Sequence, residues 1–299
     1  MEDESYLGIS PISSVKVTKM NHLVEVQHME HMNRQPNIKK LDKERYLNLK
    51  TGEICEFNQG EVRSDSYNSL LQTFKKLRYL INNNYVGAGN ELFITLTYKE
   101  NMTDTKRLYT DFKKFIKKFR YKYEKEYGSI DYMTVVEPQE RGAWHHHLLV
   151  RFNDKIGSKI FIPHNEVAEI WGHGFIRINS LKDCDNIGAY LSAYLADIEL
   201  TEDNIGVAFS EKSEVVPKMV DGQEKKFIKG GRLHLYPSGM NLYRKSKGIQ
   251  MPERIEMKYE DIKKVVGSAK PHYTKQIVVE QDDFKNTITY EQYNMKRGD

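Results

Sequence analysis

Cysteine is scarce in this chain: only Cys55 and Cys184 occur among 299 residues, far apart and in no CxxC pair. This spacing excludes a disulfide framework and a zinc site built from cysteines, so we expect reduced thiols. No apolar run reaches the roughly 18 residues that a membrane-spanning helix needs. The acidic start MEDES also lacks the basic and then apolar order of a secretory signal. We therefore expect a cytoplasmic protein without a membrane partner.

Other absences narrow the class of protein further. There is no GxxxxGK[ST] motif, so the chain has no recognisable P-loop helicase, and we find no internal repeat or low-complexity segment. The net charge of +4 and the pI of about 8.7 are only mildly basic, so bulk charge is a weak argument for a nucleic-acid partner. The length is sufficient for one large domain, or for a catalytic domain with a smaller partner.

The order of the predicted elements indicates an α+β fold. Hydrophobic periodicity and turn residues predict the following elements, in chain order: a helix over 66–84, a strand over 91–98, a helix over 104–127, strands over 131–137 and 144–152, a helix over 165–171, a strand over 175–178 and a helix over 185–200. We predict an antiparallel central sheet with helices on one face, formed by a core of residues 66–200. Smaller additions precede it at 1–65, where two short strands surround Thr51 and Gly52, and follow it at 201–299.

Positive charge is concentrated in the predicted helix over 104–127, which carries nine Lys or Arg against four acidic residues. Its apolar stripe is expected to pack on the sheet, which leaves Lys113, Lys114, Lys117 and Lys118 on the other side. A solvated helix face often has this composition. The alternative function is a salt-dependent contact with DNA phosphates.

Three consecutive histidines occur in the stretch VVEPQERGAWHHHLLVRF, which is predicted to form a β-hairpin. Alternate side chains of a strand share a face, so His145 and His147 point together and His146 points away. A hairpin would bring Glu137 near the same two histidines, and Gln139 is the other candidate for a third ligand. Two imidazoles and a carboxylate suit Mn²⁺ or Mg²⁺, and zinc is also an option. A polar strand without a metal is the competing interpretation.

A pair of tyrosines lies in the predicted helix NIGAYLSAYLADIE. Tyr190 and Tyr194 are four residues apart, so they share one helix face about 5 to 6 Å apart. Tyrosines at this spacing are usually core residues, but a tyrosine hydroxyl is also a nucleophile in covalent catalysis. Further along, RLHLY and MNLYRKSKG combine Arg232 and Arg244 with tyrosines, a mixture that can stack on bases and pair with phosphates. An ordinary exposed hairpin explains these two segments equally well.

Taken in order, FITLTY, EPQERGAWHHHLLV and GAYLSAYL resemble the three motifs of rolling-circle replication initiators of the HUH endonuclease superfamily, of the phage and plasmid type. The resemblance covers roughly residues 66–200, with looser likeness at YLNLKTGEICEF and RLHLYPSGMNLYRKSKG. It implies that His145, His147 and Glu137 are metal ligands and that Tyr190 and Tyr194 are nucleophiles. The histidines precede the tyrosines, as in replication initiators rather than in conjugative relaxases.

The resemblance also implies a substrate and partners. In such families the first motif builds the sheet and approaches DNA, and this role falls to Thr95 and Thr97. The expected substrate is single-stranded or hairpin origin DNA, which is nicked and rejoined through a 5′-phosphotyrosine with Mg²⁺ or Mn²⁺ as cofactor. Because no P-loop occurs, a host helicase and a host DNA polymerase are the expected partners.

Two residue patterns depart from the family, and other functions stay open. His146 occupies a slot that is usually apolar, and Ala193 and Asp197 stand where related proteins usually carry a lysine after each tyrosine. A single-strand transposase, a DNA-binding regulator without catalysis, and an unrelated His-x-His metalloenzyme acting on small molecules are the alternatives.

Overall fold

The computed structural model describes residues 8–32, 37–42, 44–57, 67–139, 142–181, 184–199, 215–220, 223–228, 231–232, 235–237, 239–281 and 284–297, some of them by their backbone alone. Contacts divide the chain into two compact units. One comprises residues 60–251, and the other combines residues 1–59 with 252–299. The predicted boundaries near residues 65 and 200 stay predictions, because both fall on or beside segments outside the described residues.

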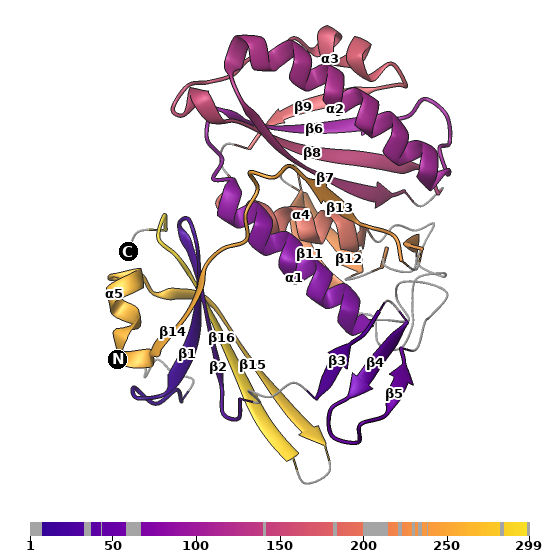
Figure 1. The fold of residues 1–299 in the computed structure, drawn as a ribbon. Helices are drawn as coiled ribbons and strands as arrows, with labels where there is room; N and C mark the ends of the chain where they lie inside the picture. The colour runs from indigo at the N-terminus through magenta and orange to yellow at the C-terminus, as the bar shows by residue number, and fades with distance from the viewer. Residues whose placement is uncertain are drawn as a thin grey trace. The chain divides into compact units, whose positions relative to one another are not determined.

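The centre of the 60–251 unit is a five-stranded antiparallel sheet in the order β13-β7-β8-β6-β9 (Figure 1). Its strands are β6 (Glu91–Thr97), β7 (Ile130–Pro138), β8 (Trp144–Phe152), β9 (Ile176–Ser180) and β13 (Tyr243–Lys245). The α+β class and the antiparallel sheet are therefore confirmed. β7 and β8 form the expected hairpin, in which Glu137 lies opposite His145 and Val135 lies opposite His147.

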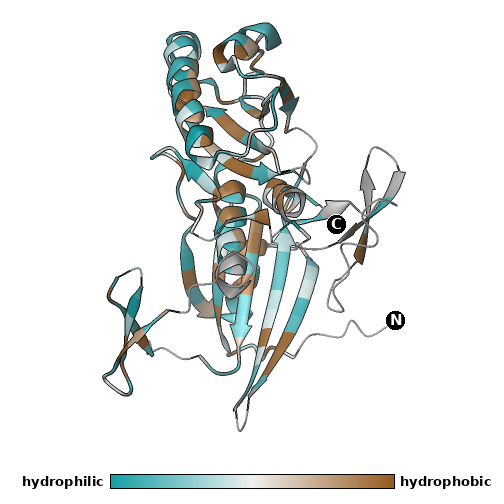
Figure 2. Ribbon diagram, turned by 90° about the vertical axis from the view of Figure 1, so that its right-hand side faces the viewer, coloured by the Kyte–Doolittle hydropathy of each residue, from teal (hydrophilic) through white to brown (hydrophobic). Residues whose placement is uncertain are grey.

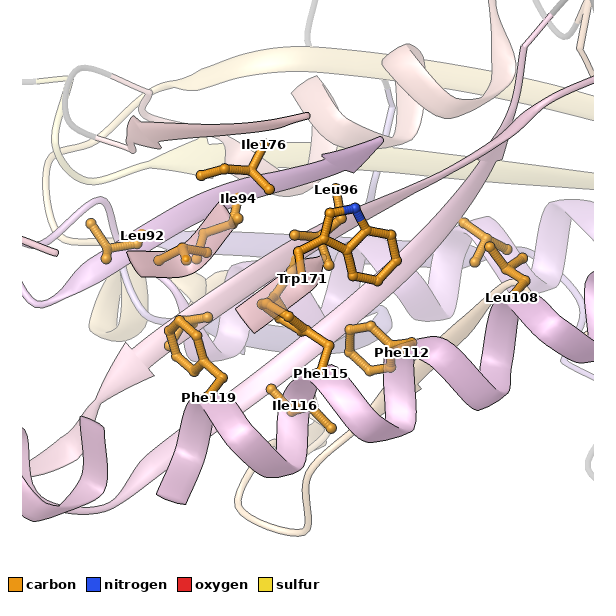
Figure 3. Packing of buried hydrophobic residues seen from close by; sticks show 14 of the residues in the cluster. Leu92, Ile94, Leu96, Leu108, Phe112, Phe115, Ile116, Phe119, Trp171 and Ile176 are labelled. Atoms are coloured by element: carbon orange, nitrogen blue, oxygen red, sulfur yellow. The ribbon is translucent and has the colours of Figure 1, made fainter. Parts of the chain in front are cut away.

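One face of this sheet is covered by α2 (Thr105–Tyr127) and α3 (His164–Trp171). Asp104 caps α2 by accepting hydrogen bonds from the backbone N–H groups of Lys106 and Arg107, as its place before the first turn predicts. The apolar stripe of α2 packs with Trp171 on alternate residues of β6 and β8 (Figure 3). Hydrophilic and hydrophobic residues alternate along this helix (Figure 2), which is the pattern of a helix with one buried side.

The opposite face is also covered, by α1 (Tyr67–Asn84) and α4 (Ile187–Ala196). Leu77 and Ile81 of α1 pack with Leu191 and Leu195 of α4 in one buried cluster, which also contains Val135 of β7. The prediction that helices cover only one face is wrong. The physical reason lies in the strands: β7 and β8 are buried at nearly every position, so both of their faces need an apolar cover.

Helix α4 is held against α1 by a close backbone approach. Asn82 accepts a hydrogen bond from the Gly188 N–H at 2.7 Å and donates to Asn186, which caps the first turn of α4 through the Ala189 N–H. A Cβ atom at Gly188 would lie 2.7 Å from the Arg78 carbonyl oxygen, so glycine permits this approach. The helix is shorter than the predicted 185–200, because it ends at Ala196 and β10 (Ile198–Glu199) follows.

Segments after residue 200 add two pieces to this unit. β10 pairs with β12 (Gln223–Ile228), which pairs with β11 (Val215–Val220), to form a small antiparallel sheet. β13 then adds to the edge of the central sheet by pairing with β7. The predicted start of the first helix at Ser66 lies outside the described residues, which begin this helix at Tyr67.

The other unit contains a five-stranded antiparallel sheet in the order β14-β1-β2-β16-β15. Its strands are β1 (Ser14–Met20), β2 (Leu23–Met29), β14 (Arg254–Lys258), β15 (Pro271–Gln281) and β16 (Phe284–Asn294). A short 3-10 turn (Tyr259–Ile262) and α5 (Lys263–Val266) pack Ile262 and Val266 on Val15 and Val26 of this sheet. The sequence did not predict these strands.

A second small sheet in this unit combines β3 (Ile38–Lys40), β4 (Arg45–Asn48) and β5 (Ile54–Glu56). β4 and β5 flank Thr51 and Gly52, so the two short strands expected there are confirmed. Among the described helices of both units, none has the length and apolar character that crossing a membrane requires.

Candidate active site

Glu137 and His147 are in direct contact on the sheet face that α1 and α4 cover. The Glu137 Oε2 atom lies 2.5 Å from the Nε2 atom of His147, and both side chains are buried. His145 lies directly opposite Glu137 in the strand register, and its ring centroid is 6.5 Å from that of His147. The alternation of β8 and the register of the hairpin thus bring all three predicted ligands to one place.

His147 is oriented by β6, the strand on its other side. Thr95 lies opposite His147, with its Oγ1 atom 3.3 Å from Nδ1, and the Phe93 ring stacks on the imidazole at 5.5 Å between centroids. Burial lowers the pKa of His147 to about 4. The imidazole is therefore neutral near pH 7, which is the form that can coordinate a metal. Thr97 lies opposite His145 in the same register.

Arg232 balances the charge of Glu137. Its Nη1 atom donates to Glu137 Oε1, and its Nε atom donates to the backbone carbonyl of Asp197 at 3.0 Å, just beyond the end of α4. The Arg232 side chain is only 18% exposed, and burial lowers the pKa of its guanidinium. A residue predicted as a peripheral DNA contact thus lies against a predicted metal ligand.

His146 lies on the opposite face of the sheet, in the core under α2. It has no exposed surface, its Nε2 donates to the Leu108 carbonyl at 3.2 Å, and its Nδ1 lies 3.2 Å from the Thr134 hydroxyl. Its ring stacks on Phe112 at 4.7 Å between centroids. Burial lowers the pKa of His146 to about 3. His146 is thus a core residue with both nitrogens hydrogen-bonded.

The buried His146 predicts that acid destabilises the protein. The folded state holds His146 neutral down to about pH 3, whereas an unfolded histidine binds a proton below about pH 6.5. Its contribution to the free energy of unfolding is complete above pH 6.5 and is lost as the pH falls, by about 2 kcal/mol at pH 5. His146→Leu should remove about this much of the acid sensitivity in urea unfolding at pH 7 and pH 5. An unchanged pH dependence would contradict the assignment.

Helix α4 carries both candidate nucleophiles and covers the histidine face. Its Leu191 and Leu195 pack with Phe93, which is two residues from Thr95, and with Leu149, which is two residues from His147. Tyr190 is 57% exposed, so its hydroxyl is not committed to the core. Tyr194 lies in the same helix, but its side chain is outside the described part of the chain.

The four predicted DNA-binding lysines are exposed on α2, as expected, but α2 covers the other face of the sheet. They are therefore separated from Glu137 by the thickness of the sheet and its core. Arg244 is at the β13 edge, where its guanidinium lies 3.9 Å above the Tyr109 ring of α2. Gln139, the other candidate ligand, closes the hairpin turn by donating its backbone N–H to the Ala143 carbonyl.

The donor set fits a divalent cation in chemistry. Two imidazoles and a carboxylate share a face, His147 is neutral, and the hydroxyl of Thr95 is close enough to orient the ring from its second nitrogen. In spacing, no group of three His, Cys, Asp or Glu side chains among the described residues stands ready to hold a metal. At 2.5 Å, the His147–Glu137 contact must widen by about 0.5 Å to admit an ion at ordinary coordination distances.

Sequence reasoning missed the contacts that connect the site to distant segments. Asn82 holds α4 from 106 residues away, and Arg232 reaches Glu137 from 95 residues away. The asparagine run at 82–84 was interpreted only as the end of a helix. Nothing in its local pattern indicates which helix Asn82 would contact.

Comparison with protein families gives one finding for this region. Residues 91–199 match the family model of a replication-associated protein of the ORF2 type, over about a third of the chain. The matched segment extends from the first residue of β6 to β10 and includes all five candidate ligands and nucleophiles. The resemblance to replication initiators of the rolling-circle type is thus confirmed. Curated proteins and solved structures give no match.

Proposed function

We propose that the protein is an HUH-type replication initiator that nicks and rejoins single-stranded origin DNA in the rolling-circle replication of a plasmid or phage. The observation that carries the proposal is the sheet face on which His145, His147 and Glu137 lie beneath α4, the helix with Tyr190 and Tyr194. All five residues fall within the segment that matches the replication-associated family. A core residue pair would not explain why Tyr190 is largely exposed.

The reaction is a transfer of one phosphodiester bond to tyrosine. The phenol oxygen of Tyr190 or Tyr194 loses its proton and bonds to the scissile phosphorus, and the bond to the 3′-oxygen breaks. The products are a 5′-phosphotyrosine and a free 3′-hydroxyl, which a host DNA polymerase can extend. The 3′-hydroxyl can later attack the phosphotyrosine and restore the DNA bond. Because the number of phosphodiester bonds is unchanged in each step, no ATP is needed.

Each residue of the candidate site has a defined task in this proposal. His145, His147 and Glu137 would hold Mg²⁺ or Mn²⁺, which when bound polarises a phosphate oxygen. Thr95 orients His147, and its neighbour Thr97 lies beside His145, where the strand would pass. A second tyrosine on α4 allows a second transfer before the first adduct is resolved.

DNA outside the site would be held by positive charge. Lys113, Lys114, Lys117 and Lys118 on α2, with Arg244, supply contacts to phosphates whose strength falls with salt. Since the sequence contains no P-loop, unwinding would fall to a host helicase.

The decisive experiment is a search for the covalent adduct. The protein is incubated with labelled single-stranded origin DNA in Mn²⁺, and the products are separated on a denaturing gel. We expect a labelled band at the mass of protein plus DNA, and its loss by at least about a hundredfold when EDTA replaces Mn²⁺. Absence of an adduct on origin strands of either polarity would overturn the proposal. An adduct that survives EDTA would remove the metal from it.

A further inference from the structure

Arg232 has an unusual set of contacts for a residue beside a phosphate-processing site. A guanidinium carries five N–H donors in a planar fork. Nε is used by the Asp197 carbonyl and Nη1 by the Glu137 carboxylate, while Nη2 makes no hydrogen bond with any described residue. The fork thus has one side fixed to the end of α4 and one side held by a single carboxylate. This carboxylate is the group that a bound cation would claim.

The charges of the site explain why this pairing matters. Glu137 is buried and negative, and the neutral His147 beside it adds no positive charge. A DNA phosphate that approached an unpaired Glu137 would meet a like charge in a poorly solvated place, which is costly. Arg232 removes this repulsion, but its guanidinium is then occupied by the carboxylate.

We propose that Arg232 exchanges partners, from the Glu137 carboxylate in the free protein to a phosphate of the bound DNA strand. The inference rests on the proposed function, because it assumes that a DNA strand enters this site. Arginine suits the exchange, since its fork binds carboxylates and phosphates with the same bidentate geometry. The Nε contact to Asp197 keeps the guanidinium beside α4 in both states, so the phosphate is held next to the tyrosine helix.

Other arginines near the sheet have different surroundings. Arg151 donates to the carboxylate of Asp131 and to the carbonyl of Asn84, and Arg244 lies over the Tyr109 ring. Arg151 is thus committed to a different carboxylate, and Arg244 to an aromatic ring on the other face of the sheet. Arg244 is therefore a matched control, because it comes from the same basic and aromatic segment and differs in its place on the sheet.

The exchange is tested by a double-mutant cycle in DNA binding without metal. The probe is a fluorescein-labelled single-stranded oligonucleotide in EDTA, and its Kd is measured by anisotropy. Glu137→Gln releases the guanidinium from its ion pair, so binding should tighten by about tenfold. In the Arg232→Gln background the same Glu137→Gln change should have no effect. Arg244→Gln should leave the gain from Glu137→Gln intact, although it weakens binding by itself.

Each outcome of the cycle decides the proposal. A gain that is equal with and without Arg232 would mean that removal of the negative charge alone helps DNA, and the exchange would be wrong. No gain in the wild-type background would overturn it as well. A tighter complex cannot come from a misfolded protein, and Arg232→Lys, which retains the charge without the fork, should recover only part of the gain. The adduct experiment, which needs Mn²⁺, tests the proposed function separately.

Discussion

Replacing Tyr190 and Tyr194 together with phenylalanine should abolish the covalent protein–DNA adduct. Phenylalanine keeps the ring and the helix propensity of α4 but removes the oxygen that forms the bond to phosphorus. We expect a loss of at least about a thousandfold in the rate of adduct formation, which is typical for the removal of a nucleophile. DNA binding in EDTA should be retained within about threefold, because no charge changes.

Tyr121→Phe is the matched control for this double variant. Tyr121 is 70% exposed on α2, under the Lys125 ammonium and on the opposite face of the sheet from Glu137. Its replacement should leave adduct formation unchanged. If the double variant still forms an adduct of normal yield, the nucleophile is another residue and the role of α4 in the proposal fails. The two single variants would then show which tyrosine attacks first, if either alone eliminates the first adduct.

Replacing His147 with alanine is expected to have the second largest effect. His147 is buried, neutral and in contact with Glu137, so its loss removes one candidate ligand and the partner that orients another. We expect nicking in Mn²⁺ to fall by at least about a hundredfold and the affinity for Mn²⁺ to fall by about tenfold to a hundredfold. Metal affinity is measured directly, by the loss of the free Mn²⁺ signal in electron paramagnetic resonance, so this readout does not depend on cleavage.

The adjacent histidine provides the comparison. His146→Leu changes the next residue of the same strand, but its side chain lies in the core on the other face. This variant should bind Mn²⁺ and nick DNA within a few-fold of the wild type, at a temperature where both are folded. Equal effects of His146→Leu and His147→Ala on Mn²⁺ affinity would contradict the face assignment. In that case the triple histidine would have to act through another arrangement.

Local patterns were sufficient for much of the candidate site. The alternation of β8 separates His146 from His145 and His147, and the turn between β7 and β8 sets Glu137 opposite His145. Asp104 before a helix with a long apolar stripe predicts both the start of α2 and its buried side. These features depend on residues that are close in sequence, where backbone geometry leaves few alternatives.

Two other segments show where local patterns were insufficient. The 1–59 and 252–299 segments form one sheet, in which β2 pairs with β16 across more than 250 residues, for example through Val26 and Glu291. Polar side chains such as Glu25 and Glu291 are buried in these strands, so the period of apolar residues is blurred. Glu291 is satisfied by hydroxyls of Tyr259 and Tyr293, and such partners cannot be identified from spacing.

The sequence by itself determined the antiparallel hairpin, the shared face of His145, His147 and Glu137, and the presence of two tyrosines on one helix. Each follows from a period of two or of 3.6 residues within a short segment. Only the tertiary structure decided that helices cover both faces of the sheet, that α4 lies over the histidines, and that Arg232 neutralises Glu137. These facts depend on which apolar faces meet and which buried charge needs a partner, and such choices are made between segments about a hundred residues apart.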